Sequence, residues 1–116
     1  MKLSLVERVP KPWGHEIIFA RSKKYVGKII VIEKGHRLSL QFHRRKHESL
    51  MVLRGRLKLL LGKKTRAVGP GSAFTIPPNT IHRFGATKWR VTLIEVSTPE
   101  LQDVVRLQDD YGRRDK

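Results

Sequence analysis

The chain has 116 residues, with 25 Lys and Arg against 10 Asp and Glu, a formal net charge of +15 and no cysteine. This length fits one domain, and the missing cysteines exclude disulfides, thiolate nucleophiles and sulfur-ligated metals. No apolar run approaches the ~20 residues of a membrane span, and none near the N-terminus is long enough for a signal peptide. We therefore expect a cytoplasmic protein with no membrane partner.

Short and often alternating apolar runs, separated by glycine, proline and asparagine, follow one another along the chain. Runs of this kind are typical of half-buried strands joined by tight turns. In chain order the expected strands cover residues 15–20, 26–33, 38–42, 49–54, 56–61, 73–76, 81–84 and 89–96. The pattern predicts an all-β sandwich or barrel in a single domain, residues 1–116, with a core at about 13–97 and a C-terminal tail at 98–116.

The tail is the one place where a helix is expected. Residues 100–107 suit one or two helical turns, with Thr98 as the cap in front of Pro99. The acidic residues of the tail also roughly balance its basic ones, so the positive charge belongs to the centre of the chain. Such a charge attracts anions.

Four polar side chains are placed where they could converge on one cation. Gln41 and His43 lie two residues apart at an expected strand, so both point to the same face. Glu48 begins the next strand, and His82 follows a tight turn. Two imidazoles, a carboxylate and an amide oxygen suit a divalent metal, for which we expect zinc first, with manganese, iron, nickel or cobalt as alternatives.

Each of these ligands has an alternative role. Gln41 could hydrogen-bond a metal-bound water instead of the metal, and Glu48 could form a salt bridge with one of the many surrounding bases. His43 and His82 could be buried structural histidines.

The spacing of the same residues resembles the paired motifs of the cupin superfamily, whose fold is a double-stranded β-helix or jelly-roll barrel. The first motif is matched by Gly35, Gln41, His43, Glu48 and Gly55, and the second by Gly71, Pro77, Asn79 and His82. Gln41 stands where many cupins have their first histidine. Asn79 replaces the usual glycine, a mild change because asparagine also tolerates a left-handed backbone.

A narrower resemblance covers nearly the whole chain and concerns the cupin domain of type II phosphomannose isomerases. Its most specific blocks are residues 38–43 and 110–113, supported by residues 11–14, 76–78 and 81–83. The resemblance implies a metal-dependent isomerase that converts mannose-6-phosphate to fructose-6-phosphate through an enediolate, with the metal as electrophile. The family often carries this domain behind a sugar nucleotidyltransferase domain, which 116 residues cannot contain, so nucleotide-sugar synthesis is not expected.

The base of such a reaction is not singled out by spacing. Candidates are Lys28, His36, His47 and Glu95, of which the resemblance favours Lys28. A strand lysine is otherwise commonly solvated, and Glu95 could instead support Arg83.

Basic residues near the metal motif are candidates to hold the phosphate. Arginine makes paired hydrogen bonds to phosphate oxygens, and we expect Arg37, Arg83 and Arg44 as the candidates, with Arg37 or Arg83 reaching the substrate. The expected partner is a small sugar phosphate.

Two alternatives to the isomerase remain open. Where the phosphomannose isomerase family has Arg before and His-Trp after the glutamate, this chain has Lys46, Ser49 and Leu50. These departures favour a non-catalytic, metal-containing cupin that binds a sugar or another small anion. Nucleic acid is not expected, because aromatic residues are only 7% of the chain and no known module is present. A homodimer is expected, with the Trp13 segment and the C-terminal tail as candidates to cross between subunits.

Overall fold

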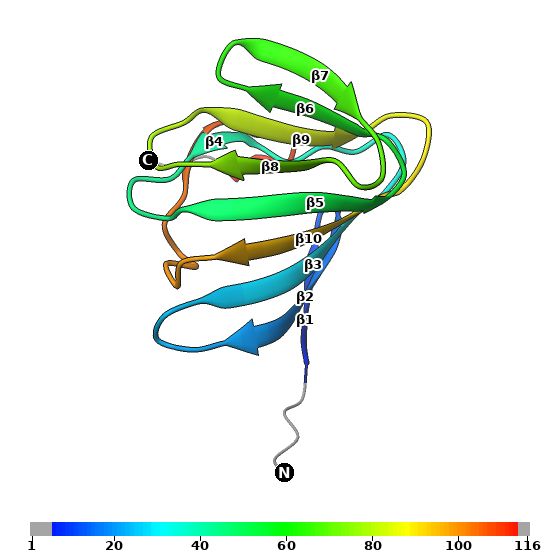
Figure 1. The fold of residues 1–116 in the computed structure, drawn as a ribbon. Helices are drawn as coiled ribbons and strands as arrows, with labels where there is room; N and C mark the ends of the chain where they lie inside the picture. The colour runs from blue at the N-terminus through cyan, green and yellow to red at the C-terminus, as the bar shows by residue number, and fades with distance from the viewer. Residues whose placement is uncertain (1–5, 114–116) are drawn as a thin grey trace.

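The computed structural model describes residues 6–113, which form two antiparallel β-sheets packed face to face and contain no helix (Figure 1). One sheet has six strands in the order β1-β2-β3-β10-β5-β8, and the other has five in the order β11-β4-β9-β6-β7. The strands are β1 (Glu7–Lys11), β2 (Gly14–Arg21), β3 (Val26–Ile32), β4 (Leu40–Phe42), β5 (Glu48–Arg54), β6 (Leu57–Leu61), β7 (Lys64–Val68), β8 (Ala73–Ile76), β9 (His82–Ala86), β10 (Val91–Ser97) and β11 (Val105–Gln108). The expected all-β class is confirmed.

Each of the eight expected strands has a counterpart, and β1, β7 and β11 were not expected. Strand β7 shows why, because its first three residues are polar or charged and exposed, and they carry no apolar alternation. The strand forms because a two-residue turn at Gly62 and Lys63 returns the chain beside β6, with Leu61 opposite Lys64. Gly62 has a φ of 65°, which glycine adopts without strain.

The short helix expected at residues 100–107 is wrong. The chain instead makes a turn at Leu101 and Gln102 and then enters β11, which pairs antiparallel with β4. Val104 and Val105 are β-branched and favour extended backbone. Pairing with the free edge of β4 supplies hydrogen bonds that an isolated helix of two turns could not match in stability.

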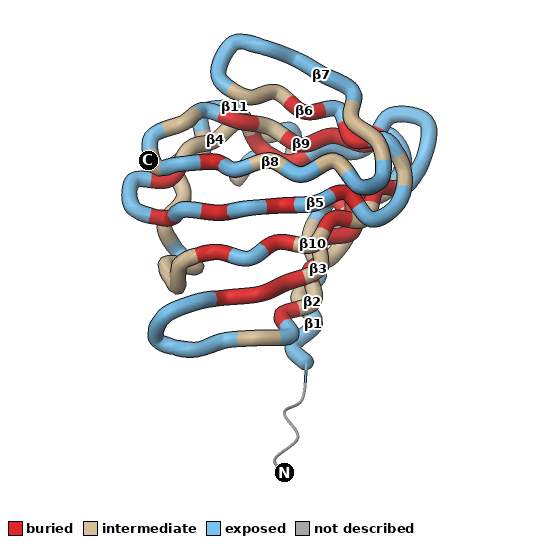
Figure 2. The backbone as a smooth tube through the Cα atoms, viewed as in Figure 1, coloured by how far each residue is buried: buried red, intermediate tan, exposed pale blue. Residues whose placement is uncertain are grey.

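The inward-facing residues of β3, β5 and β10 divide the interior into two ends. Side chains of a strand point alternately to its two faces, and Figure 2 shows this alternation along β5 and β10. The buried residues at alternate positions include Lys28, Ile30 and Ile32 on β3, Glu95, Leu93 and Val91 on β10, and Glu48, Leu50 and Val52 on β5. Register places Val91 opposite Ile32, Leu93 opposite Ile30 and Glu95 opposite Lys28. One end is therefore apolar and the other is charged.

The apolar end is the hydrophobic core, in which buried residues of both sheets meet. Phe84 of the five-stranded sheet packs edge-on against Phe74 of the six-stranded sheet, with ring centroids 5.9 Å apart. Trp13 belongs to this core and is only 2% exposed. Its side chain is thus enclosed within the single chain, whereas residues 114–116 of the expected interface segment lie outside the described residues. The dimer and the domain bounds stay predictions.

The part of the chain that the structure describes contains no helix that could cross a membrane.

Candidate metal centre and its pocket

Three buried side chains bring possible metal-binding atoms to one point between the sheets. His43 directly follows β4, Glu48 begins β5 and His82 begins β9. The imidazole Nε2 atoms of His43 and His82 each lie 3.4 Å from Glu48 Oε1. One potential ligand atom from each residue lies within 4.8 Å of the others. The trio fits a divalent ion, although its role as a ligand set stays a prediction.

The second nitrogen of each imidazole is tied to the backbone. His43 Nδ1 donates to the carbonyl of Asp103 at 2.6 Å, and His82 Nδ1 donates to the carbonyl of Thr80 at 2.9 Å. A carbonyl only accepts, so the proton must sit on Nδ1 in both rings. The lone pairs on Nε2 are then directed toward Glu48, and both Nε2 atoms are buried without a hydrogen-bond partner. Histidines that bind metals are oriented in this way.

Gln41 lies next to the trio, because β4 and β9 pair at Gln41 and His82. Its side chain lines one pocket together with His43 and Glu48. Its Oε1 accepts a hydrogen bond from Ser39 Oγ at 3.2 Å. The amide can therefore be held in place without a metal. The structure brings Gln41 beside the trio, and direct ligation stays a prediction.

Asp103 organises the loop that carries His43, a role that the sequence did not reveal. Its carboxylate accepts backbone N–H groups from Arg44, Arg45 and Lys46 at 3.1, 2.7 and 2.9 Å. Its slight burial would raise its pKa, but these three donors outweigh that effect and hold the pKa of Asp103 below its usual range. The carboxylate of Asp103 thus fixes the loop, and its backbone carbonyl fixes the His43 ring.

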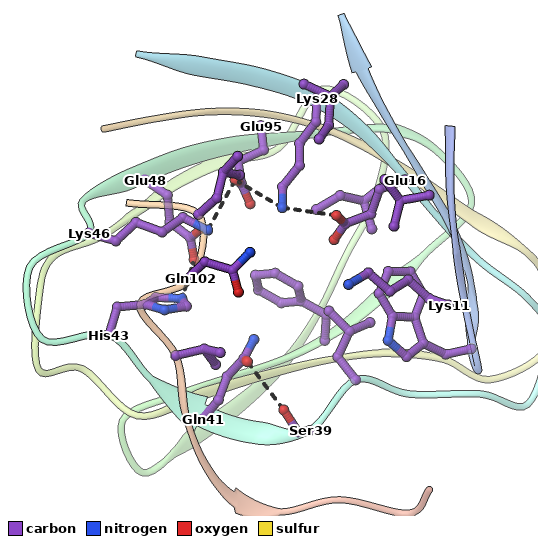
Figure 3. Close-up of a pocket in the computed structure, with 18 of the residues that line it drawn as sticks. Lys11, Glu16, Lys28, Ser39, Gln41, His43, Lys46, Glu48, Glu95 and Gln102 are labelled. Carbon is purple, nitrogen blue, oxygen red and sulfur yellow. Dashed lines mark hydrogen bonds and ion pairs between the residues drawn. The ribbon is translucent and has the colours of Figure 1, made fainter. Parts of the chain in front are cut away.

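A chain of buried charges continues from the trio along the pocket wall (Figure 3). Lys46 Nζ lies 3.1 Å from Glu48 Oε2 and 3.4 Å from Glu95 Oε2. Lys28 Nζ lies 3.8 Å from that same Glu95 oxygen and 3.2 Å from Glu16 Oε1. Both candidate catalytic residues, Lys28 and Glu95, are therefore in the pocket and adjacent to each other.

Burial and neighbouring charges shift the pKa values of these buried groups in different directions. Burial, followed by the nearby charge of Glu48, raises the pKa of Glu95 to about 8. Burial would also raise the pKa of Glu48, but hydrogen bonds from His43 and His82, when their Nε2 atoms carry a proton, and the charge of Lys46 keep it well below the usual range. Burial would lower the pKa of Lys46, yet Glu95 and Glu48 together raise it to about 12. Near neutral pH, Glu48 is a carboxylate and Lys46 is an ammonium.

The pocket also carries cations to which the sequence analysis assigned no role. The cavity measures about 280 Å³, and Lys11, Arg106 and Arg113 line it together with Lys28. Burial lowers the pKa of Lys11, and the charges of Lys28, Arg113 and Arg106 add to that effect against the opposing charge of Glu16. These bases are therefore close enough to act on one another. Strands β1 and β11, which the sequence pattern missed, supply two of them.

The three arginines predicted to hold phosphate lie elsewhere, and none lines this cavity. Arg37 is half-exposed and binds Asp110, with Nε donating at 2.7 Å. Arg83 Nε donates to the carbonyl of Leu38 at 2.9 Å. Arg44 is exposed, and its guanidinium carbon lies 5.7 Å from the Phe42 ring centroid. Their role as phosphate ligands stays a prediction without a contact to the pocket.

The remaining base candidates are also outside the pocket. His36 and His47 are both exposed, and His36 stacks on Tyr111 with ring centroids 6.3 Å apart. Arg83 lies on β9 and does not pair with Glu95 among the described residues. Lys28 and Glu95 are thus the two candidates that the fold brings to the metal centre.

Comparison with known sequences identifies a family and several mannose-1-phosphate guanylyltransferases as relatives. The family model described as "Mannose-6-phosphate isomerase C-terminal" matches residues 2–109. A mannose-1-phosphate guanylyltransferase of Salmonella typhimurium, RfbM, is 29% identical over 110 residues, covering 91% of this chain and 23% of that protein. A mannose-1-phosphate guanylyltransferase of Escherichia coli K12 is 32% identical over 109 residues, covering 90% and 23%. The chain spans about a quarter of the length of these relatives.

Comparison with solved structures confirms the fold. An RmlC-like cupin from Shewanella frigidimarina superposes with a TM-score of 0.73 over 81% of this chain and 84% of its own, at 17% sequence identity. The jelly-roll barrel expected from the paired motifs is therefore correct.

Proposed function

The chain belongs to the mannose-6-phosphate isomerase C-terminal family, and from that membership we propose that it is a metal-dependent sugar-phosphate isomerase. In this proposal it interconverts mannose-6-phosphate and fructose-6-phosphate. The observation that carries the proposal is one pocket lined by His43 and Glu48 of the possible metal trio, by Lys28 between two carboxylates, and by further cations. A metal-assisted aldose–ketose isomerisation uses such parts as the electrophile, the base and the phosphate contacts.

A divalent metal would be held by His43, Glu48 and His82, with Gln41 beside it, and would polarise the sugar carbonyl. Zinc is the first candidate, followed by manganese, iron, nickel and cobalt. The buried and unpartnered Nε2 atoms of both histidines support this assignment.

Lys28 and Glu95 would move the proton. In the forward direction one of them removes the proton from C2 of mannose-6-phosphate and returns it to C1, while the hydroxyl proton at O2 passes to O1. Lys28 Nζ and Glu95 Oε2 lie 3.8 Å apart, which is an ion-pair distance longer than a hydrogen bond, so both groups face the same part of the pocket and either could act as the base. Glu16, at 3.2 Å, holds the amine on its other side and acts as a positioning residue.

Lys11 and Arg113 would face the phosphate. Both line the cavity, Lys11 across from His43 (Figure 3), and Arg113 is oriented by two hydrogen bonds to Asp109, with Nε and Nη2 donating at 3.0 and 2.9 Å. A sugar held between these bases and the trio would present its carbonyl end to the metal and its C6 end to the cations. In this proposal Lys11 and Arg113 are better placed to contact the phosphate than the three arginines expected from the sequence, because only the former line the cavity.

A non-catalytic cupin that binds a sugar or another small anion is the second candidate. It is favoured by the ion pairs of Lys28 and of Lys46, because two carboxylates already lie beside each amine. Such pairing suits a rigid binding site as well as a catalytic one.

The test begins with elemental analysis of the purified protein and a coupled assay of mannose-6-phosphate conversion. For wild type we expect bound metal and turnover. For His43→Ala and His82→Ala we expect loss of the metal and a fall in turnover of at least about 10³-fold, which corresponds to several kcal/mol of lost transition-state stabilisation. The matched control is His36→Ala, an exposed histidine outside the pocket, for which both quantities should stay at the wild-type level.

Two outcomes contradict the proposal in different ways. Bound metal without turnover would leave the metal centre in place and favour the binding protein. Absence of metal after divalent ions are added back would reject the ligand assignment itself.

A further inference from the structure

A second concave surface lies on the outside of the five-stranded sheet, at the end formed by the β6–β7 hairpin and the loop between β9 and β10. The groove measures about 310 Å³. Four cations line it, namely Arg56, Lys58, Arg66 and Lys88, and all four are exposed. Trp89 lines the same groove and is 69% exposed. None of these residues lines the pocket with the metal trio.

The charge of this groove is uncompensated. Its lining contains no acidic residue. Within residues 6–113, none of the four cations has a carboxylate oxygen within 4.0 Å, whereas Arg21, Arg37, Arg90 and Arg113 elsewhere on the surface each have one. The groove is therefore a site of positive potential that is open to solvent.

Protection of a sheet edge explains part of this surface. Strand β7 is the edge of its sheet, and charged residues on edge strands prevent pairing with other chains. That explanation accounts for Arg66 on β7. It does not account for Lys88 and Trp89, which lie on the β9–β10 loop, nor for an indole placed in solvent among cations.

We propose that this groove binds single-stranded nucleic acid, with phosphates along the four cations and a base stacked on Trp89. Proteins that bind single strands combine a cationic groove with an aromatic side chain as a stacking platform. A second copy of this chain would bring like charges together and be repelled. The composition argued against nucleic acid because aromatic residues are few, but the fold gathers one exposed indole and four bases in one groove. This inference is independent of the isomerase proposal.

Trp89 itself provides the measurement. The chain has two tryptophans, and Trp13 is 2% exposed in the core, so quenching by an added strand reports on Trp89. The ligand is an oligothymidylate of about 15 nucleotides, titrated at several salt concentrations. We expect quenching of the exposed indole and a salt slope, log K against log salt, of about −3, because four neutralised phosphates on a single strand contribute about −0.7 each.

Two variants separate stacking from charge. Trp89→Ala should weaken binding about 5- to 150-fold, followed by anisotropy of a labelled strand, because stacking of one base contributes about 1–3 kcal/mol. Lys58→Gln combined with Arg66→Gln should flatten the salt slope by about 1.4. The matched control is Lys23→Gln combined with Lys24→Gln, which makes the same change in net charge in the β2–β3 turn. The side-chain hydroxyl of Ser22 holds that turn through backbone N–H groups, so the control retains its fold.

Three results would overturn the proposal. The first is an equal loss of affinity in the Lys23/Lys24 control, which would indicate diffuse attraction to net charge. The second is polyglutamate binding as tightly as the strand with no effect of Trp89→Ala, which would indicate an acidic-peptide surface. The third is no quenching and no anisotropy change at low salt.

Discussion

The two ends of the barrel interior are built from the same strands and differ in chemistry. On β3, Ile30 and Ile32 face the core, whereas Lys28, two positions earlier, faces the pocket. On β10, Leu93 faces the core and Glu95 the pocket. A step of two residues along a strand thus exchanges an apolar environment for an ionic one without changing the face. The fold can therefore place charges in its interior at positions set by the register of the sheet.

The two ends also differ in what they contribute to stability. Burial of a leucine or isoleucine side chain stabilises a protein by about 1.5–3 kcal/mol. Buried ion pairs must offset the loss of hydration of both charges, so their net contribution is small or unfavourable. We infer that the apolar end holds the barrel together and that the charged end is retained for its chemistry.

The largest expected effect separates the two ends directly. Leu93→Ala removes a fully buried side chain from the apolar end and should lower the free energy of unfolding by about 2–5 kcal/mol, measured by urea denaturation. Metal content of the folded protein should not change. The matched control is Leu53→Ala at a side chain that is 38% exposed, with an expected change within about 0.5 kcal/mol. A parallel loss of metal affinity in Leu93→Ala would mean that the two ends are not separable.

Lys28→Met acts on the charged end. If Lys28 moves the proton, kcat for mannose-6-phosphate should fall by about 10²–10⁴-fold while metal content stays at the wild-type level. Lys11→Met makes the same change of charge in the same pocket, at the side assigned to phosphate, and should raise KM with little effect on kcat. Equal changes in kcat and KM for the two variants would remove the distinction between proton transfer and phosphate binding.

Asp103→Asn tests the loop that carries His43 and Lys46 at the charged end, with a smaller effect. Loss of the carboxylate that accepts three backbone N–H groups should cost about 0.5–2 kcal/mol at pH 7, as for other capping residues. The pKa of Asp103 is lowered in the folded protein. Its contribution is therefore present above the unfolded value of about 3.9 and is lost as the pH falls through the folded value.

Urea denaturation of wild type and variant at pH 7 and below pH 3 checks this sign. The difference in stability should be present at pH 7 and small at the acid pH. Asp110→Asn is the control, because its carboxylate is 41% exposed and accepts hydrogen bonds from the side chains of Arg37 and Arg83 instead of backbone N–H groups, so it should change stability less. A difference that persists unchanged in acid would show that the carboxylate charge is not the cause.

Much of the fold could be predicted because its strongest signals are local. Alternating residues such as 91–96 and the turn residues around Gly62 indicate strands and turns without reference to the rest of the chain. The strands that were missed, β1, β7 and β11, have weak alternation and form because neighbouring edges accept them. The expected helix at residues 100–107 failed for the same reason, since pairing with β4 is a long-range interaction.

The candidate site was predicted in part. Motif spacing identified His43, Glu48 and His82, which the fold brings together. It did not identify Asp103, which lies 60 residues from His43 in the chain and holds its ring. It also assigned the phosphate to arginines near the motif, whereas the cations that line the pocket come from β1, β11 and the C-terminal segment.

The sequence by itself determined the class of fold, most of its strands and the residue types of a possible metal centre. These follow from alternation, turn residues and spacing, which are properties of neighbours in the chain. Only the tertiary structure decided which charges share the interior with that centre. Lys28, Glu95 and Lys11 lie far apart in sequence, and the register of the six-stranded sheet, set by burial of the apolar end, brings them to one pocket.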